Sequence, residues 1–251
     1  HQRQFLAWGL AIDFEGTHLT NTELRMRSGG NFSPAIEEVT FEEDTDEPIE
    51  VRIVVGIGES VPAQAGWYIV CNGRVVLSAD RSEETGWDTV AEQKDGIPKY
   101  HNQYARFRGV TFFNCRSSRK LPWNTTKTGL DTSSPIWLAV RPKMLDHTRT
   151  AINFLNTLDD EIEEYGKSSA PLLGALANET IAKEVEKFQG TRPFSWNKAP
   201  KAPGPKFTKI QYSREDSRIQ ALKVALGVGS AKAVGETTFD MIYKEQGEDG
   251  E

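Results

Sequence analysis

Apolar and polar positions alternate in several short stretches of the chain and recur at helical spacing in one longer stretch. Residues 10–16, 51–57 and 109–115 follow the patterns of half-buried or buried strands. Residues 67–78 read as two strands around Asn72-Gly73, the dipeptide that most strongly favours a two-residue hairpin turn. From 148 to 165 apolar residues fall at three- and four-residue steps, which predicts a helix whose stripe packs on a sheet formed by 51–57, 67–78 and 109–115: Ile152, Leu155, Leu158, Ile162 and Tyr165.

This pattern predicts an α+β fold in which a β-rich domain is followed by a small tail. A short helix is expected near 175–187, and the Pro/Lys-rich residues 198–205 should lack regular structure. After them the pattern gives a strand, a helix and a second helix, a β-α-α unit. Five parts are expected along the chain: the C-terminal end of a preceding domain at 1–50, a β-rich domain at 51–165, a linker at 166–205, the β-α-α tail at 206–243 and a disordered acidic end at 244–251.

Composition limits the classes of protein to be considered. The 251 residues can bury a substantial core, and 37% hydrophobic with 26% charged residues is ordinary for a globular protein. The net charge of −6 argues against a surface that coats nucleic acid uniformly. No run approaches the roughly 18 apolar residues of a membrane span. We therefore expect a cytoplasmic protein that does not enter a membrane.

The cysteines, the histidines and the acidic run of the chain give few signs of a catalytic or metal-binding site. Cys71 and Cys115 lie in strand-like surroundings and are expected to be buried free thiols, although a disulfide is conceivable. The four histidines are scattered, so no metal site is expected. His101 lies in a long aromatic insertion, 80–108, where it could act in acid/base or phosphate chemistry or anchor the loop by a hydrogen bond. The acidic run at 42–50 reads as a solvated loop.

The most informative stretch is 121–131, LPWNTTKTGLD, in which Lys127 follows Thr125 and Thr126. Asparagine, threonine and glycine favour an irregular, locally hydrogen-bonded loop. A lysine on such a loop can merely interact with solvent, but its long flexible stem also suits it to reach a phosphate. We expect the Lys127 side chain to be exposed, without a buried carboxylate partner, in a loop held by local hydrogen bonds.

The order of strand, Asn72-Gly73-Arg74 turn, strand, Thr-Thr-Lys loop and helix resembles the transducer domain of GHKL ATPases, the superfamily of gyrase B, MutL and the MORC proteins. MutL-like members carry a similar NGR hairpin, and gyrase carries a Gln-Thr-Lys loop. Here Thr125 stands where that glutamine would be. The resemblance extends to residues 3–9 and 10–16, which are similar to the last helix and strand of the nucleotide-binding domain, and covers roughly 1–165.

The resemblance implies a ribosomal-protein-like mixed sheet with helices on one face, and a role for three loop residues. Lys127, with Thr125 and Thr126, would contact the γ-phosphate of ATP, bound with Mg²⁺ in a homodimeric parent that changes conformation with its nucleotide. The acidic helix, DxGxG segment and Gly-rich lid of such sites are absent from the sequence, as is GxxxxGK[ST]. Because the chain begins at His1, we expect the nucleotide-binding domain upstream, and neither catalytic residues nor bound nucleotide in this chain alone.

The tail supports a different class of function. Its expected strand, helix and helix resemble the ribbon-helix-helix module, whose paired strands enter the DNA major groove. In that case Lys206, Lys209 and Gln211 would contact DNA, and the chain would be a DNA-binding or partner-binding regulator. The same tail could serve in dimerisation or docking without any contact to DNA.

Overall fold

The computed structural model describes residues 12–19, 24–89, 96–196, 208 and 210–247. The chain forms two compact units, residues 1–207 and 208–251, which are described separately. The fold is mixed α+β, as predicted. The helix expected at 3–9 and part of the strand expected at 10–16 lie outside the described residues; the rest of that strand is present as β1 (Ile12–Phe14), paired with β2 (Thr17–Leu19).

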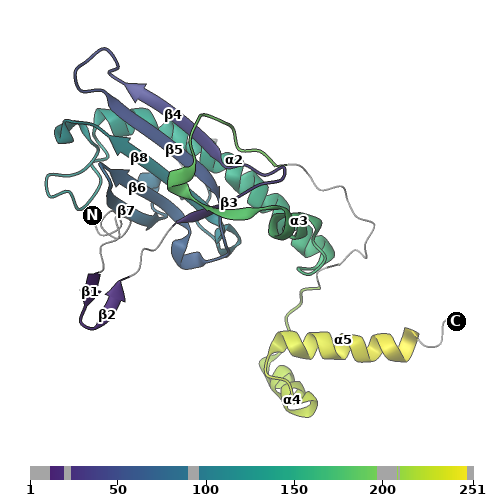
Figure 1. Cartoon of the computed structure of the whole chain (residues 1–251). Helices are drawn as coiled ribbons and strands as arrows, with labels where there is room; N and C mark the ends of the chain where they lie inside the picture. Colours follow the sequence, from purple (N-terminus) through teal and green to yellow (C-terminus); the bar gives the residue numbers. More distant parts are fainter. Residues whose placement is uncertain (1–11, 20–23, 90–95, 197–207, 209, 248–251) are drawn as a thin grey trace. The chain divides into compact units, whose positions relative to one another are not determined.

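A five-stranded mixed sheet forms the centre of the first unit (Figure 1). Its order is β4-β5-β8-β6-β7, and all neighbours are antiparallel except β6 and β8, which are parallel. The strands predicted at 51–57, 67–78 and 109–115 therefore share one sheet, whereas the strand predicted at 10–16 lies in the separate β1-β2 pair. The bounds are β4 (Ala35–Phe41), β5 (Ile49–Ile57), β6 (Gly66–Cys71), β7 (Arg74–Asp80) and β8 (Phe107–Asn114).

The 31-residue helix α2 (Pro135–Tyr165) covers one face of this sheet. The predicted stripe packs there: Ile152, Leu155 and Leu158 are buried in the larger core, and Ile162 packs against it half-buried. The helix begins thirteen residues earlier than 148 because the Ser134 hydroxyl caps it, accepting a hydrogen bond from the Trp137 amide at 3.3 Å. Proline is favoured at the next position, which Pro135 occupies.

The opposite face is covered by a two-stranded sheet of β3 (Arg25–Ser28) and β9 (Ile181–Glu184). In Figure 1 this pair lies on the near side of the main sheet and α2 on the far side. Met26 and Phe188 are fully buried in the second core between the two sheets. Because both faces are covered, the interior strand β5 reads as a continuous apolar run from Ile53 to Ile57.

Two expected boundaries are wrong. The sheet does not begin at residue 51, since β4 lies within the range assigned to a preceding domain and pairs along its whole length with β5. Residues 166–196 are no mere linker: they hold α3 (Pro171–Glu179), β9 and the buried Phe188 and Phe194. The short helix expected at 175–187 is present as α3 but lies earlier and ends at Glu179, because from Ile181 the chain pairs with β3.

Five single turns of 3₁₀ helix connect these elements, at Pro62–Gln64, Glu83–Thr85, Asn102–Tyr104, Ser118–Lys120 and Val185–Lys187. The insertion at 80–108 contributes to the main core, where Trp87 is fully buried beside the rings of Tyr100, Tyr104 and Phe107. Among the helices that the structure describes, none combines the length and apolar character needed to cross a membrane.

The second unit consists of α4 (Asp216–Leu226) and α5 (Ala231–Gly247). Gly227 ends α4 in the left-handed conformation, with φ of 66°. The predicted strand at 206–213 is wrong where it can be judged, because residues 208 and 210–213 form no strand. Lys206 and Lys209 lie outside the described residues. The end at 244–251 is helical as far as Gly247, which corrects the expectation of disorder there.

Candidate functional site

The Asn72-Gly73 turn is tied to the end of β8. Both residues have positive φ, 46° and 76°, as the predicted two-residue hairpin requires. The Asn72 side chain donates a hydrogen bond to the Cys115 carbonyl at 2.8 Å and accepts one from the Cys115 amide at 3.0 Å. Its backbone amide also donates to the Phe113 carbonyl at 2.8 Å. The hairpin of β6 and β7 is therefore clamped to the chain that leads into the Thr-Thr-Lys loop.

That loop, 123–130, is closed on itself by hydrogen bonds around one side chain. Trp123 and Leu130 form an isolated bridge, and the Asn124 amide donates to the Gly129 carbonyl at 2.9 Å. The Asn124 Oδ1 accepts from the Thr128 amide at 3.0 Å and from the Thr126 hydroxyl at 2.9 Å. The loop is held locally, as predicted, but its organiser is Asn124 rather than the threonines.

Lys127 occupies the tip of this loop in the left-handed conformation, with φ of 55°. Its Nζ lies 4.6 Å from the centroid of the Trp123 ring, and the indole Nε1 is fixed by donating to the Ser118 carbonyl at 2.7 Å. The residue is half-buried, so the prediction of a fully exposed side chain is wrong: the stem packs on the indole. No carboxylate among the described residues pairs with Lys127, as expected.

The other proposed contacts of the loop are exposed. Thr125 and Thr126 both face solvent, and the Thr126 and Thr128 hydroxyls are 2.7 Å apart. Arg74 is half-buried at the start of β7. The structure ties the Asn72 turn to Cys115 at the end of β8, ten residues before Thr125. Gln211, the one proposed DNA contact in the described part of the tail, is exposed in irregular chain.

The acidic connection between β4 and β5 contacts the same region of the chain. The Lys120 ammonium, in the 3₁₀ turn before the loop, lies 2.8 Å from the Glu42 carboxylate and 3.6 Å from that of Glu47, and the hydrogen bond that it donates to Glu42 raises the pKa of Lys120. The Cys115 thiol donates to the Glu47 carbonyl at 3.7 Å. The acidic run is therefore docked by a lysine rather than simply solvated.

Two other candidate groups are the cysteines and His101. Cys71 and Cys115 are free and buried, as predicted, and burial raises the pKa of Cys71 to about 12. His101 is exposed, and its backbone carbonyl accepts a hydrogen bond from the Tyr104 amide at 2.9 Å; within the described ranges its side chain makes no hydrogen bond. This corrects the interpretation of a side-chain hydrogen bond that anchors the insertion.

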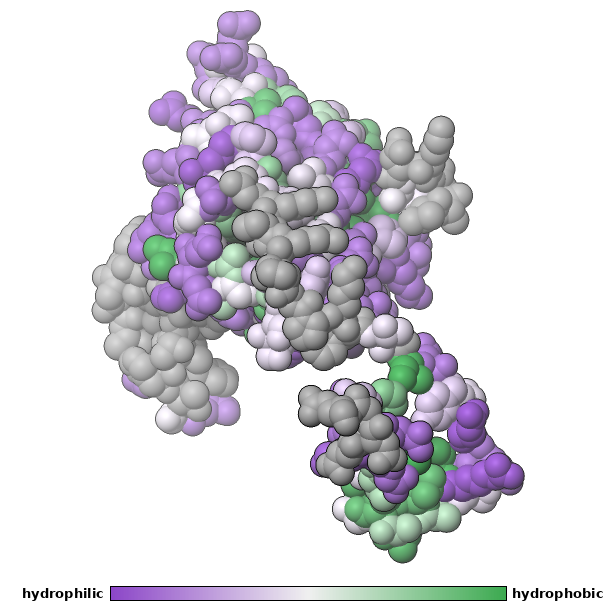
Figure 2. All heavy atoms as spheres, turned by 90° about the vertical axis from the view of Figure 1, so that its right-hand side faces the viewer, coloured by the Kyte–Doolittle hydropathy of each residue, from purple (hydrophilic) through white to green (hydrophobic). Residues whose placement is uncertain are grey.

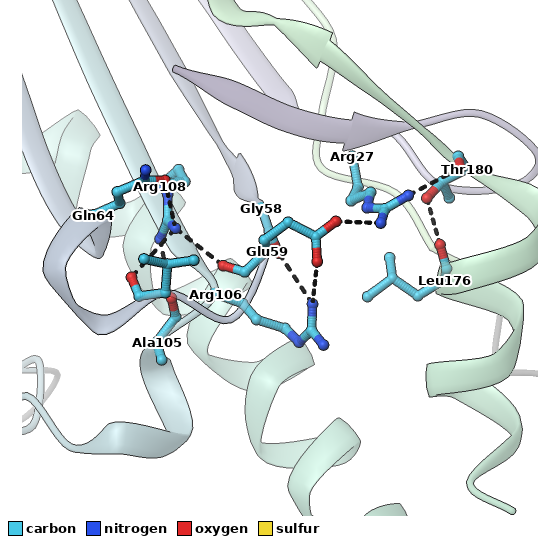
Figure 3. Close-up of polar contacts among 10 residues, drawn as sticks. Arg27, Gly58, Glu59, Gln64, Ala105, Arg106, Arg108, Leu176 and Thr180 are labelled. Carbon is cyan, nitrogen blue, oxygen red and sulfur yellow. Dashed lines mark hydrogen bonds and ion pairs between the residues drawn. The ribbon is translucent and has the colours of Figure 1, made fainter. Parts of the chain in front are cut away.

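Sequence reasoning missed a cluster of arginines around Glu59 (Figure 3). Arg27 and Arg106 approach opposite oxygens of the half-exposed Glu59 carboxylate, the second at 4.0 Å, and Arg27 also donates to the Thr180 carbonyl at 3.2 Å. Arg108 is fully buried and donates to the Glu59 carbonyl at 3.0 Å. Burial lowers the pKa of Arg106 and of Arg108. The cluster fastens β3 to the main sheet, and no local sequence signal marks a contact between positions so far apart.

Comparison with models of protein families finds no match to this chain, and comparison with curated proteins finds none either. Within the described ranges no group of histidine, cysteine and acidic side chains could hold a metal ion.

Proposed function

We propose that the chain is the transducer part of a cytoplasmic GHKL-type ATPase, with Lys127 as the group that senses the γ-phosphate of ATP. Three features support the proposal: the NGR hairpin lies beside the strand that leads to the loop, the sheet is mixed, and the loop runs directly into the long helix α2. The order and the residues are those on which the resemblance rests.

The observation that carries the proposal is the state of Lys127. Its backbone lies in a closed loop, its stem packs on Trp123, and its ammonium has no carboxylate partner among the described residues. A structural lysine on a surface is expected to find such a partner or to extend into water. Here the loop is built, and the ammonium lies over the Trp123 ring with no carboxylate to neutralise it, so a phosphate from another domain could still bind it.

In this role Lys127 adds one charge-assisted hydrogen bond to ATP that ADP cannot provide, worth roughly 1.5–3 kcal/mol. ATP and its Mg²⁺ would be held by a nucleotide-binding domain, and this chain would supply only the lysine and its flanking Thr125 and Thr126. Asn72 ties the hairpin to Cys115, at the start of the segment that leads to the loop, and the loop ends four residues before α2. A displacement at Lys127 would therefore be passed to both the sheet and the helix.

The experiment requires the protein with its nucleotide-binding domain. Lys127→Met keeps the apolar stem on Trp123 and removes the charge, so it should fold normally and lower ATP turnover by about tenfold to a hundredfold. Lys99→Ala is the control, because Lys99 is an exposed lysine on the 80–108 insertion whose ion pair with Asp88 is long, at 4.0 Å. Unchanged turnover in Lys127→Met, with a normal unfolding midpoint, would overturn the proposal.

A further inference from the structure

The described surface of the first unit offers charge rather than apolar area to a ligand. Figure 2 shows mostly hydrophilic residues, in purple, on the visible face of this unit. Three large hydrophobic side chains are exposed among its described residues, and they lie on three different elements: Val75 on β7, Leu138 on α2 and Ile181 on β9. A ligand of this unit is therefore expected to be recognised through charged groups.

Positive charge exceeds negative charge in the cluster around Glu59. The cluster contains three guanidinium groups, those of Arg27, Arg106 and Arg108. Within the described ranges Glu59 supplies the one carboxylate that forms an ion pair with them. The Arg27 and Arg106 side chains are 20% and 18% exposed, and Arg108 is fully buried. A charge that is largely removed from water without a partner is costly, so a further anion would stabilise this cluster.

The Glu59 carboxylate occupies a place between two arginines from different strands (Figure 3). Arg27, on β3, donates a hydrogen bond to one of its oxygens, whereas the Arg106 Nη1, next to β8, lies 4.0 Å from the other, too far for a hydrogen bond. Burial lowers the pKa of Arg106, Glu59 raises it and Arg27 lowers it, so the two guanidinium groups lie within range of each other's charge. Glu59 therefore satisfies this place only in part.

The side chain of Glu59 can leave this place while its backbone stays fixed. The side chain is 58% exposed, so the carboxylate can turn into water, where it is well solvated. The Glu59 carbonyl accepts hydrogen bonds from the buried Arg108 at 3.0 Å and from the Val61 amide at 2.8 Å. An exchange of the carboxylate for another anion therefore needs only a change of side-chain rotamer.

The two arginines are held independently of the Glu59 carboxylate. Arg27 donates to the Thr180 carbonyl and Arg106 to the Gly58 carbonyl, both at 3.2 Å. Guanidinium groups fit the oxygens of a phosphate with several donors at once. A phosphate monoester also carries close to two negative charges at neutral pH, so it balances two arginines, which a single carboxylate does not.

We propose that Arg27 and Arg106 form a binding site for a phosphate monoester, and that Glu59 occupies this site when the ligand is absent. The proposal does not depend on Lys127 and stands whether or not the chain belongs to an ATPase. Because Arg27 lies on β3 and Arg106 next to β8, the bound phosphate would join the β3-β9 pair to the main sheet. Binding should therefore also stabilise the first unit against unfolding.

Calorimetry on the intact 251-residue chain, with inorganic phosphate and glycerol 3-phosphate at constant ionic strength in chloride, tests the proposal. Glu59→Gln removes the competing charge and should bind both at least about tenfold more tightly than wild type. Arg106→Met keeps the apolar stem and should abolish binding, and Arg106→Lys keeps the charge without the planar fork and should weaken it at least about tenfold. Glu42→Gln is the control, because the Glu42 carboxylate is 49% exposed and pairs with a lysine, Lys120, outside the cluster; it should leave the affinity unchanged.

Four results would overturn the proposal. Absence of binding to Glu59→Gln at about 10 mM phosphate would leave the cluster with the role of fastening β3 alone. Weaker binding in Glu59→Gln than in wild type would mean that Glu59 does not compete with the anion. Binding that survives Arg106→Met would place the anion elsewhere. A diester, dimethyl phosphate, that binds as tightly as the monoester would contradict the match of two charges, because it carries one.

Urea unfolding provides a second measurement if a substitution lowers the stability of the chain. Phosphate should raise the urea midpoint of Glu59→Gln more than that of wild type, and it should not raise the midpoint of Arg106→Met. Equal shifts in all three proteins would mean that phosphate acts on the chain without this site.

Discussion

Removal of the Asn72 side chain should destabilise the first unit through the clamp between the hairpin and β8. Asn72→Ala deletes two hydrogen bonds to the Cys115 backbone, each worth about 1 kcal/mol, and places alanine in a left-handed conformation that costs about 1 kcal/mol more. We therefore expect the free energy of unfolding to fall by about 3 kcal/mol. Asn72→Gly accepts the positive φ but still lacks the hydrogen bonds, so its free energy of unfolding should be about 2 kcal/mol below that of wild type.

Equilibrium unfolding in urea, followed by tryptophan fluorescence, measures this loss. All six tryptophans lie at or before position 196, so the signal reports the first unit and not the tail. Asn114→Ala, at an exposed residue at the end of β8, is the control and should stay within about 0.5 kcal/mol of wild type. A glycine variant as stable as wild type would refute the reasoning, because backbone conformation alone would then account for the asparagine.

Three further predictions concern stability and reactivity. Burial raises the pKa of Glu37, but hydrogen bonds from Lys143 and His147 outweigh it and lower that pKa below its ordinary 4.5. The stabilisation by ionised Glu37 is therefore fully present above the pKa of this group in the unfolded chain, and it is lost as the pH falls through its pKa in the folded chain. Glu37→Gln should be less stable than wild type at neutral pH, and its urea midpoint should fall less between about pH 6 and pH 3. Cys71, with a pKa of about 12, should resist alkylation at about pH 8 until urea unfolds the chain, and rapid native labelling at this residue would contradict its burial. Gly86→Ala should cost roughly 1–3 kcal/mol by urea unfolding, because φ is 98° and a Cβ would lie 2.0 Å from a leucine methyl of α2; a neutral result would contradict the close packing there.

Local signals in the sequence predicted the parts of the fold that depend on neighbouring residues. The Asn-Gly dipeptide predicted the hairpin and its positive φ values, and the three- and four-residue spacing from Ile152 predicted which face of α2 packs on the sheet. The irregular loop around Lys127 followed from its threonines and glycine. Each of these inferences needed only a few consecutive residues and a known backbone preference.

The features that were missed depend on contacts between distant segments. Residues 181–184 read as the end of a helix, but their backbone pairs with β3, more than 150 positions earlier. The bond from Arg27 to Thr180 and the stacking of Lys127 over Trp123 likewise arise only once the chain is folded. Tertiary pairing overrides local propensity in such segments, and a single sequence contains no record of which distant residue is the partner.

The central claim is that Lys127 distinguishes ATP from ADP. Binding of a non-hydrolysable ATP analogue and of ADP, measured by calorimetry on the protein with its nucleotide-binding domain, tests it directly in wild type and Lys127→Met. We predict that the substitution weakens binding of the analogue by about tenfold or more and leaves the affinity for ADP unchanged, because only the analogue presents a γ-phosphate. An equal effect on both nucleotides, or no effect on either, would contradict it.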